Sequence, residues 1–392
     1  MKNLNFYLIE FALNSIFRQK GKNIFIFTLL TLLVFLVTSF FQIATGLKSE
    51  ALQTVDTLPQ ITIQKLQGGR TIPIEIAKVD ELLQINGVKS AEGRVWGYYY
   101  FANQNIYFTI VGIDQFEEQA KKTFEEVTSK YNFDEMKNGM IIGKGVEKIL
   151  KENSFEEYFN FIKSNGEVKR VSILGTFHRD TTLETNDVML VPQSIAYEIL
   201  ELSGDMATDI VVKVENIEEI DTIAAKIKTM FPMCRVITKE ELKRSYENMF
   251  HYKSGLFLAL FTICLFSFFM IIYDKSSGLH SSEKKEIGIL KAVGWSTNDI
   301  LKWKFYEAVI VSKTAFFCGL ILSFFYVYIL KAPLLKDLFL GTGILKPEFN
   351  IPFIFDIESL AMTFFITVPI YIAATIFPSW RVSITEADEV LR

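Results

Sequence analysis

The 392-residue sequence is poor in the side chains that most often carry chemistry. It has three histidines and three cysteines, and His178, His251 and His280 lie in different regions. No Ser/His/Asp pattern, HExxH motif or GxxxxGK[ST] phosphate loop occurs. We therefore expect that the chain is not an enzyme, that it has no catalytic, cofactor-binding or metal-binding residues, and that it does not bind ATP through a phosphate loop.

The sequence also lacks a large excess of positive or negative charge, because its net charge is only -4. A nucleic-acid partner therefore has no electrostatic support. Cys234 has no partner cysteine in the polar middle of the chain, so this region cannot rely on an internal disulfide. Half of all residues are hydrophobic, and the mean hydropathy is +0.25. This composition favours a membrane protein.

Four apolar stretches are long enough to cross a bilayer, which takes about 20 helical residues. The first has no charge between Lys22 and Lys48, and it lacks a clean signal-peptide cleavage site. Lys313 is the one ionisable residue within a span. It is either a proton or substrate site or a side chain that reaches the cytoplasmic interface, and we favour the second. The predicted transmembrane helices are 23–47, 254–273, 308–330 and 358–378.

Positive residues near the ends of the spans predict the orientation. Arg18, Lys20 and Lys22 precede the first span, six lysines lie between the second and third, and Arg381 follows the fourth. Both termini should therefore be cytoplasmic, together with 274–307 and 379–392. Segments 48–253 and 331–357 should lie outside the cytoplasm.

The first 22 residues predict an amphipathic helix on the inner membrane surface. The alternative is a cytoplasmic extension of the first span, and a break at Gly21 favours the interfacial helix. The polar stripe consists of Asn3, Glu10, Asn14 and Arg18, and the apolar residues include Leu4, Leu8, Phe11, Leu13, Ile16 and Phe17.

Segment 48–253 predicts an α+β domain from its β-branched and aromatic runs. Asn165–Gly166, between two such runs, predicts a tight hairpin. The expected strands are Ile61–Lys65, Val95–Phe101, Ile106–Gly112, Val168–Gly175, Val188–Val191 and Ile210–Val214. The expected helices are Ile74–Gln84, Gly145–Lys151 and Ile217–Met230.

Three motifs in this domain allow a functional interpretation. Gly143-Lys144-Gly145 resembles part of a dinucleotide loop, but the third glycine is missing. Met230, Met233 and Cys234 offer soft ligands for Cu(I), although a packed turn around Pro232 explains them as well. The aromatic strand Val95–Phe101 either exposes a face that grips a client or sugar or is buried on both sides, and we expect burial.

The predicted cytoplasmic loop contains a short helix with defined ends. Ser282 is a candidate N-cap, Gly294 a C-terminal stop, and Ser296 to Asp299 the start of the next helix. The short helix is apolar over most of its surface, with Ile287, Leu290 and Gly294 on one side and Ile289, Ala292 and Val293 on the other. Such a helix must bury itself. The pattern leaves open whether it packs on its own membrane bundle or in a groove of a cytoplasmic partner.

This loop, EKKEIGILKAVGWSTNDI, resembles the hallmark loop of the FtsX-like/MacB-type permeases of ATP-binding-cassette systems. The carboxyl end, ATIFPSWRVSITEADEVLR, and the start, ALNSIFRQKGKNIFIFTLLTLL, are similar to that family's closing and opening segments. The resemblance implies an α-helical membrane bundle of four transmembrane helices, one plus three. A large α+β extracytoplasmic domain is then inserted after the first helix.

The resemblance also implies partners and a site. We expect a bacterial inner-membrane protein that pairs with a second permease copy or paralogue and with a separate cytoplasmic ATPase, which would bind ATP and Mg. The coupling helix seated in the ATPase would contain Glu286, Ile287, Ile289, Leu290, Lys291, Val293 and Gly294.

The expected function is to transmit ATP-driven motion across the membrane for export or extraction of an envelope client such as a lipoprotein. The alternative is a non-transporting signalling scaffold that activates a cell-wall hydrolase. A conventional pore or carrier is disfavoured, because the spans offer Thr262, Ser267, Thr363 and Thr367 but almost no charge. An enzyme of the membrane surface is a weaker possibility.

Overall fold

The computed structural model describes residues 6–114, 138–177, 185–249, 281–340, 343–345 and 351–384, with a few positions between 259 and 273. The chain divides into two compact units. A helical unit consists of Met1–Leu47, Phe250–Lys336 and Ile351–Arg392, and a second unit consists of Lys48–Met249 and Asp337–Asn350.

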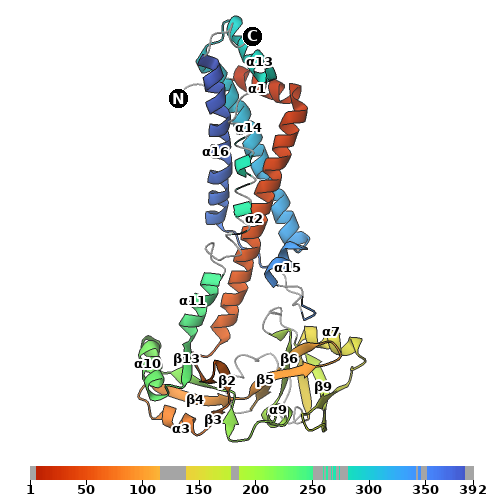
Figure 1. The fold of residues 1–392 in the computed structure, drawn as a ribbon, viewed down its shortest axis with the longest axis vertical. Coiled ribbons are helices and arrows are strands. Elements are labelled where there is room, and N and C mark those ends of the chain that lie inside the picture. Colours follow the sequence, from red (N-terminus) through yellow and green to blue (C-terminus); the bar gives the residue numbers. More distant parts are fainter. Residues whose placement is uncertain are drawn as a thin grey trace. The chain divides into compact units, whose positions relative to one another are not determined.

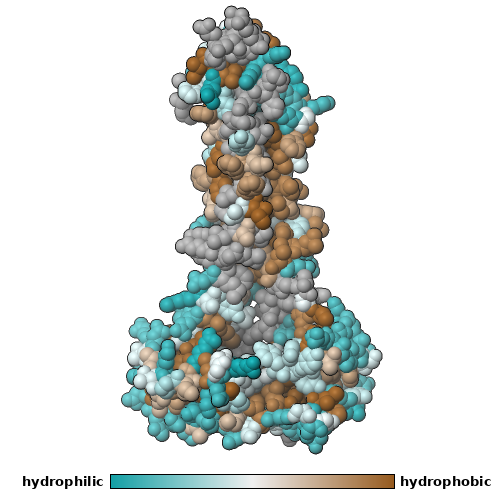
Figure 2. Space-filling model, viewed as in Figure 1, coloured by the Kyte–Doolittle hydropathy of each residue, from teal (hydrophilic) through white to brown (hydrophobic). Residues whose placement is uncertain are grey.

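The helical unit contains three helices that are long and apolar enough to cross a membrane, over Lys20–Asp56, Thr297–Ile329 and Ile357–Ile384. Figure 2 shows apolar residues, in brown, along the exposed sides of this unit. The predicted span 254–273 lies largely outside the described residues, so three of the four spans are confirmed as candidates. The helices are α1 (Phe6–Arg18), α2 (Lys20–Thr57), α13 (Ser281–Ala292), α14 (Thr297–Phe324), which ends in a π-helical turn at Phe325–Ile329, and α16 (Ile357–Ile384). Helix α2 continues past Leu47 into the second unit, and α15 (Leu335–Leu340) also crosses the boundary between the units.

Small and apolar side chains bring the three long helices together. A Cβ added at Gly319 of α14 would lie 2.7 Å from the Thr31 carbonyl oxygen of α2, so only glycine allows this approach. Val34, Phe316 and Val368 form a buried cluster that joins α2, α14 and α16. These contacts define one bundle, in which the long helices run alongside one another (Figure 1).

Helix α1 packs on the same end of the bundle as α13 (Figure 1). Leu8 and Ala12 are buried, whereas Phe6 and Phe17 are largely exposed. The helix therefore has one packed face and one free apolar face. The break between α1 and α2 falls at Gln19 rather than at Gly21, which lies within α2.

The second unit is an α+β domain, and its described residues form two large sheets and one two-stranded sheet. In the first sheet the strand order is β13-β1-β12-β4, all neighbours are antiparallel, and β2 pairs with the far end of β1. Helices α3 (Lys78–Leu83) and α10 (Ile220–Met230) contribute to its core. The strands are β1 (Ile61–Gln67), β2 (Arg70–Ile72), β4 (Val88–Arg94), β12 (Asp209–Val214) and β13 (Cys234–Thr238), and α11 (Lys239–Met249) follows β13.

The second sheet has the order β5-β6-β10-β7-β9-β8, in which β6/β10 and β7/β9 are parallel pairs. Helices α7 (Lys144–Glu152) and α9 (Gln193–Leu200) contribute to its core. The strands are β5 (Trp96–Phe101), β6 (Ile106–Ile113), β7 (Gly139–Ile142), β8 (Tyr158–Ile162), β9 (Val168–Thr176) and β10 (Val188–Pro192). A separate short pair consists of β3 (Ile74–Glu75) and β11 (Met206–Ala207).

Most expected elements of this domain are confirmed, and one is wrong in part. The Asn165–Gly166 hairpin joins β8 to β9, and Gly166 has a φ of +84°. The helix expected over Ile74–Gln84 begins only at Lys78, because the buried Ile74 pairs as a strand with Ala207. The sequence reasoning missed the strands β2, β4, β7, β11 and β13 and the helices α9 and α11.

Candidate coupling site on helix α13

The carboxyl end of α13 and the start of α14 are fixed by local backbone and side-chain chemistry. Gly294 has a φ of +99°, its N–H donates to the Lys291 carbonyl oxygen at 3.0 Å, and the Trp295 N–H donates to the Leu290 carbonyl oxygen at 3.0 Å. This pair of bonds is a Schellman motif, as the predicted stop requires. Ser296 then caps α14 by accepting from the Asp299 N–H at 3.2 Å. The described helix already includes Ser281, so the prediction that Ser282 is its N-cap is wrong.

One face of α13 packs against its own bundle. Ile287 is fully buried and shares a cluster with Leu8 and Ala12 of α1 and with Ile300 and Trp303 of α14. Leu290 and Trp295 are partly buried against the same cluster. The inner face of α13 therefore belongs to the core at this end of the helical unit.

Both acidic residues of α13 also point toward the bundle. Glu283 is buried and lies 2.9 Å from the Lys22 Nζ of α2. Glu286 pairs with the Arg18 guanidinium and accepts from Gln19 Nε2 at 2.9 Å. These contacts tie α13 to the junction between α1 and α2.

The carboxyl end of α16 is held beside α13. The Lys291 Nζ donates to the Ser383 carbonyl oxygen at 2.9 Å, and the Thr297 hydroxyl donates to the same oxygen at 3.1 Å. One orphan carbonyl at the end of α16 is thereby satisfied by α13 and α14. The three segments form a single packed end of the helical unit.

The opposite face of α13 has no apolar cover among the described residues. Ile289 is 57% exposed and Val293 is 75% exposed. Lys285, Ile289 and Val293 follow one another at four-residue spacing, so they form one stripe. Ala292 and Lys284 are exposed beside it. We call these five residues the outer face of α13.

The seven predicted coupling residues therefore fall into two groups. Glu286, Ile287, Leu290 and Lys291 contact the bundle, whereas Ile289, Val293 and Gly294 lie at the surface. Sequence reasoning missed the bundle's own contributions. The opposite charges at the start of α2 and in α13 were only a weak signal for these ion pairs, because the sequence allows many other pairings of charged residues. The missed residues are Arg18, Lys22, Trp303 and Ser383.

A buried ion pair stabilises the start of α14 near this site. Lys304 and Glu307 are both buried, and Nζ lies 2.8 Å from Oε2. Nζ also lies 4.2 Å from the centre of the Trp303 ring. Removing one partner would leave a buried charge without its counterion, which typically costs about 3–5 kcal/mol.

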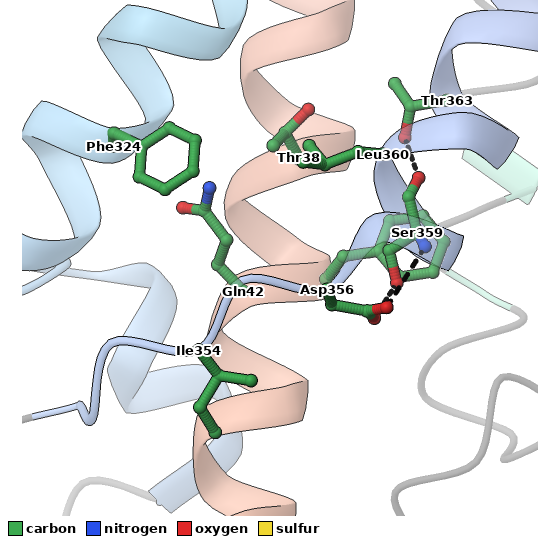
Figure 3. A pocket seen from close by; sticks show the side chains of 9 residues that line it. Thr38, Gln42, Phe324, Ile354, Asp356, Ser359, Leu360 and Thr363 are labelled. Carbon is green, nitrogen blue, oxygen red and sulfur yellow. Dashed lines mark hydrogen bonds between the residues drawn. The ribbon is translucent and has the colours of Figure 1, made fainter.

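A small pocket lies between α2, α14 and the start of α16 (Figure 3). Beside it, Ser39 donates to Ser323 at 3.0 Å, and Ser323 donates to Gln42 Oε1 at 3.1 Å. Thr38 Oγ1 and Gln42 Nε2 have no hydrogen-bond partner within the described part of the chain. The residues that line it are Thr38, Phe41, Gln42, Phe324, Ile354, Asp356, Ser359, Leu360 and Thr363.

Several polar side chains of the spans form hydrogen bonds within their own helix. The Thr363 and Thr367 hydroxyls donate to carbonyl oxygens one turn earlier, at 2.9 and 2.7 Å. Asp356 accepts from the Glu358 and Ser359 N–H groups and so caps α16. Lys313 lies on the exposed side of α14 rather than in the pocket. That its side chain reaches the cytoplasmic interface stays a prediction.

The glycines of the Gly143-Lys144-Gly145 motif have a packing role. A Cβ at Gly143 would lie 2.0 Å from the Thr185 carbonyl oxygen, and one at Gly145 would lie 2.5 Å from Asn186 Nδ2. Both positions need glycine because the chain at 185–186 passes so close. The motif is thus explained without a nucleotide.

The sulfur residues around Pro232 differ in exposure. Cys234 is buried, which raises the pKa of its thiol, whereas Met233 is mostly exposed. A thiol with a raised pKa forms the metal-binding thiolate less readily. Within the described ranges no group of three or more His, Cys, Asp or Glu residues could hold a metal ion.

The aromatic strand β5 has one buried and one exposed face. Tyr99 and Phe101 pack in the core of the second sheet. Tyr98 is 65% exposed and Tyr100 is 47% exposed, and the Tyr100 ring lies 5.1 Å from that of Tyr107 on β6. The prediction that the strand is buried on both sides is therefore wrong.

With this geometry established, comparison with known proteins identifies the membrane part. Residues 255–387, which include α13, α14 and α16, match the family model described as FtsX-like permease C-terminal. This part of the chain is similar to the carboxyl-terminal domain of the FtsX-like permeases. The family implies a membrane component of an ABC transporter that works with a cytoplasmic ATPase. A search of curated proteins found no match.

Two solved structures are similar to about half of the chain. The periplasmic region of MacB from Actinobacillus actinomycetemcomitans is 15% identical, with 50% of this chain and 98% of that chain covered and a TM-score of 0.31. The extracellular domain of the noncanonic ABC-type transporter YknZ from Gram-positive bacteria is 13% identical, with 45% and 99% covered and a TM-score of 0.29.

Proposed function

We propose that this FtsX-like permease transmits the motion of a separate ATPase through α13 to the α+β domain, for export or extraction of an envelope client. ATP and Mg would be bound by the ATPase. The observation that carries the proposal is the outer face of α13, where Ile289 and Val293 are exposed on a helix that is otherwise fixed to its bundle. An exposed apolar stripe on a rigid helix suits insertion into a groove.

The proposal assigns different work to the two faces of α13. The inner face, with Ile287, Glu283 and Glu286, would pass movement to α1, α2 and α14, because it is packed and ion-paired to them. The outer face would receive the movement from the ATPase. A second permease copy or paralogue would complete the complex, as the family resemblance suggests.

The orientation is proposed from the charges that flank the spans. Both termini and α13 would be cytoplasmic, and the α+β domain would lie outside the inner membrane. Single cysteines introduced at Lys169 and Lys285, in a chain without native cysteines, test this in intact cells. An impermeant thiol reagent should label the first only. Labelling of the second alone would reverse the orientation.

The docking role is tested with Val293→Asp. A carboxylate in an apolar groove should weaken ATPase binding at least tenfold, because the charge loses water without gaining a partner. The measurement is the amount of ABC ATPase, identified by mass spectrometry, that co-purifies per permease. Membrane abundance should stay normal, because the Val293 side chain is mostly exposed.

Ile217→Asp is the matched control. Ile217 is 73% exposed, much like Val293, but it lies in the α+β domain. This variant should retain the ATPase. If Val293→Asp retained the ATPase as well as Ile217→Asp did, the outer face of α13 would not be the docking site.

ATP hydrolysis should belong to the complex and not to the chain. We expect the purified permease to show no ATPase activity, and the permease with its ATPase to show it. Activity of the isolated permease that persists after contaminating ATPases have been removed would contradict this assignment.

A further inference from the structure

We infer that the groove that receives α13 is apolar at its centre and carries carboxylates on its rim. This inference rests on the proposed function and specifies the partner surface. It starts from the separation of charges on α13. The helix has two glutamates, and both face the bundle in ion pairs, whereas Lys284 and Lys285 are exposed.

The separation leaves the outer face with charge of one sign. Neither acidic residue of the described helix contributes to it, and Lys291 is turned away to the Ser383 carbonyl oxygen. Lys285 lies one turn before Ile289, which lies one turn before Val293. The stripe therefore begins with a cation and continues with apolar side chains. A complementary surface places carboxylates where the stripe begins and apolar residues along the rest.

The two parts of the stripe should act on different steps of binding. Charges at the rim of an interface mainly change the association rate and its salt dependence, whereas buried apolar contacts mainly change the dissociation rate. Lys284 and Lys285 should therefore accelerate docking, and Ile289 and Val293 should hold the docked state. A permease whose ATPase site is only apolar would show no such division.

The experiment measures binding of the purified ATPase to the full-length permease in detergent at low and at high salt. The double variant Lys284→Glu/Lys285→Glu should associate roughly tenfold more slowly at low salt, and the difference should shrink at high salt. Lys302→Glu is the matched control, since Lys302 is also exposed but lies on α14. It should bind at the wild-type rate.

Two results would overturn the inference. If the double variant associated like wild type while Val293→Asp still released the ATPase, docking through α13 would stand and the acidic rim would be wrong. If the double variant bound the ATPase more tightly, the surface that receives the two lysines would not be acidic, and the inference would be wrong.

Discussion

Helix α13 and strand β5 both carry apolar or aromatic residues on two opposite sides, so both sides of each element would need to be covered to keep these residues from water. In both, one side is buried and the other is exposed. On α13 the buried side contains Ile287 and the exposed side Val293, and on β5 Phe101 is buried whereas Tyr98 is exposed. Apolar composition therefore indicates that an element needs cover, but it does not say on how many sides.

The two elements differ in how their buried sides are secured. α13 is fixed by ion pairs from Glu283 and Glu286 as well as by apolar packing. β5 is fixed by backbone pairing with β6 and by aromatic packing. Because both glutamates of α13 face the bundle, the exposed side of this helix carries only apolar and basic residues. The exposed side of β5 carries tyrosines, whose hydroxyl groups tolerate water.

The largest effect is expected when a charge is placed on the buried side of α13. Ile287→Asp would bury an unpaired carboxylate in the cluster with Leu8 and Trp303, at a cost of several kcal/mol. We expect low membrane abundance and a clearly lowered melting temperature in detergent. Normal abundance and stability would show that α13 is not part of the core of the helical unit.

A somewhat smaller effect is expected on the buried side of β5. Phe101 is buried and its ring lies 5.5 Å from that of Phe108. Phe101→Ala should destabilise the α+β domain by about 3–5 kcal/mol, because it removes a large buried side chain and leaves a cavity. Denaturant unfolding of the full chain, followed by tryptophan fluorescence, measures the change. An effect below about 1 kcal/mol would contradict the packing of this strand.

An intermediate effect is expected at the end of α13. Gly294 has a φ of +99°, and a Cβ there would meet no atom within 4 Å. Gly294→Ala should thus cost about 1–2 kcal/mol through backbone strain alone. We expect a normally inserted permease with several-fold weaker ATPase binding. Wild-type affinity would indicate that the orientation of the helix end is unimportant for docking.

The smallest effect is expected on the exposed side of β5. Tyr98→Ser changes a side chain that is mostly in water, so the free energy of unfolding should change by no more than about 0.5 kcal/mol. The same unfolding measurement as for Phe101→Ala provides the comparison. A loss similar to that of Phe101→Ala would mean that both sides of β5 are covered in the complete molecule.

Local signals predicted the carboxyl end of α13, the cap of α14 and the hairpin at Asn165–Gly166. A glycine at a helix end, a Ser/Asp cap and an Asn-Gly turn each act on neighbouring residues, so they can be recognised in the sequence. The strand at Ile74–Glu75 could not be recognised in this way, because its partner strand begins at Met206. Long-range pairing overrides local preference there.

The division of the coupling residues could not be predicted for the same reason. Leu290 and Val293 are both apolar residues of one short helix, and only remote residues distinguish them. Trp303 and Lys22 approach α13 from α14 and α2, and their proximity follows from the tertiary fold. The family resemblance identified the right segment but not the side of the helix that is free.

The two sides of α13 can be compared most directly by cross-linking. Single cysteines at Val293 and at Leu290, each in a chain without Cys234, Cys264 and Cys318, would be treated with a short thiol-to-amine cross-linker in the complex with the ATPase. The proposed docking predicts a permease–ATPase product from Val293→Cys and little or none from Leu290→Cys. Equal products from both positions, or a product from Leu290→Cys alone, would contradict it.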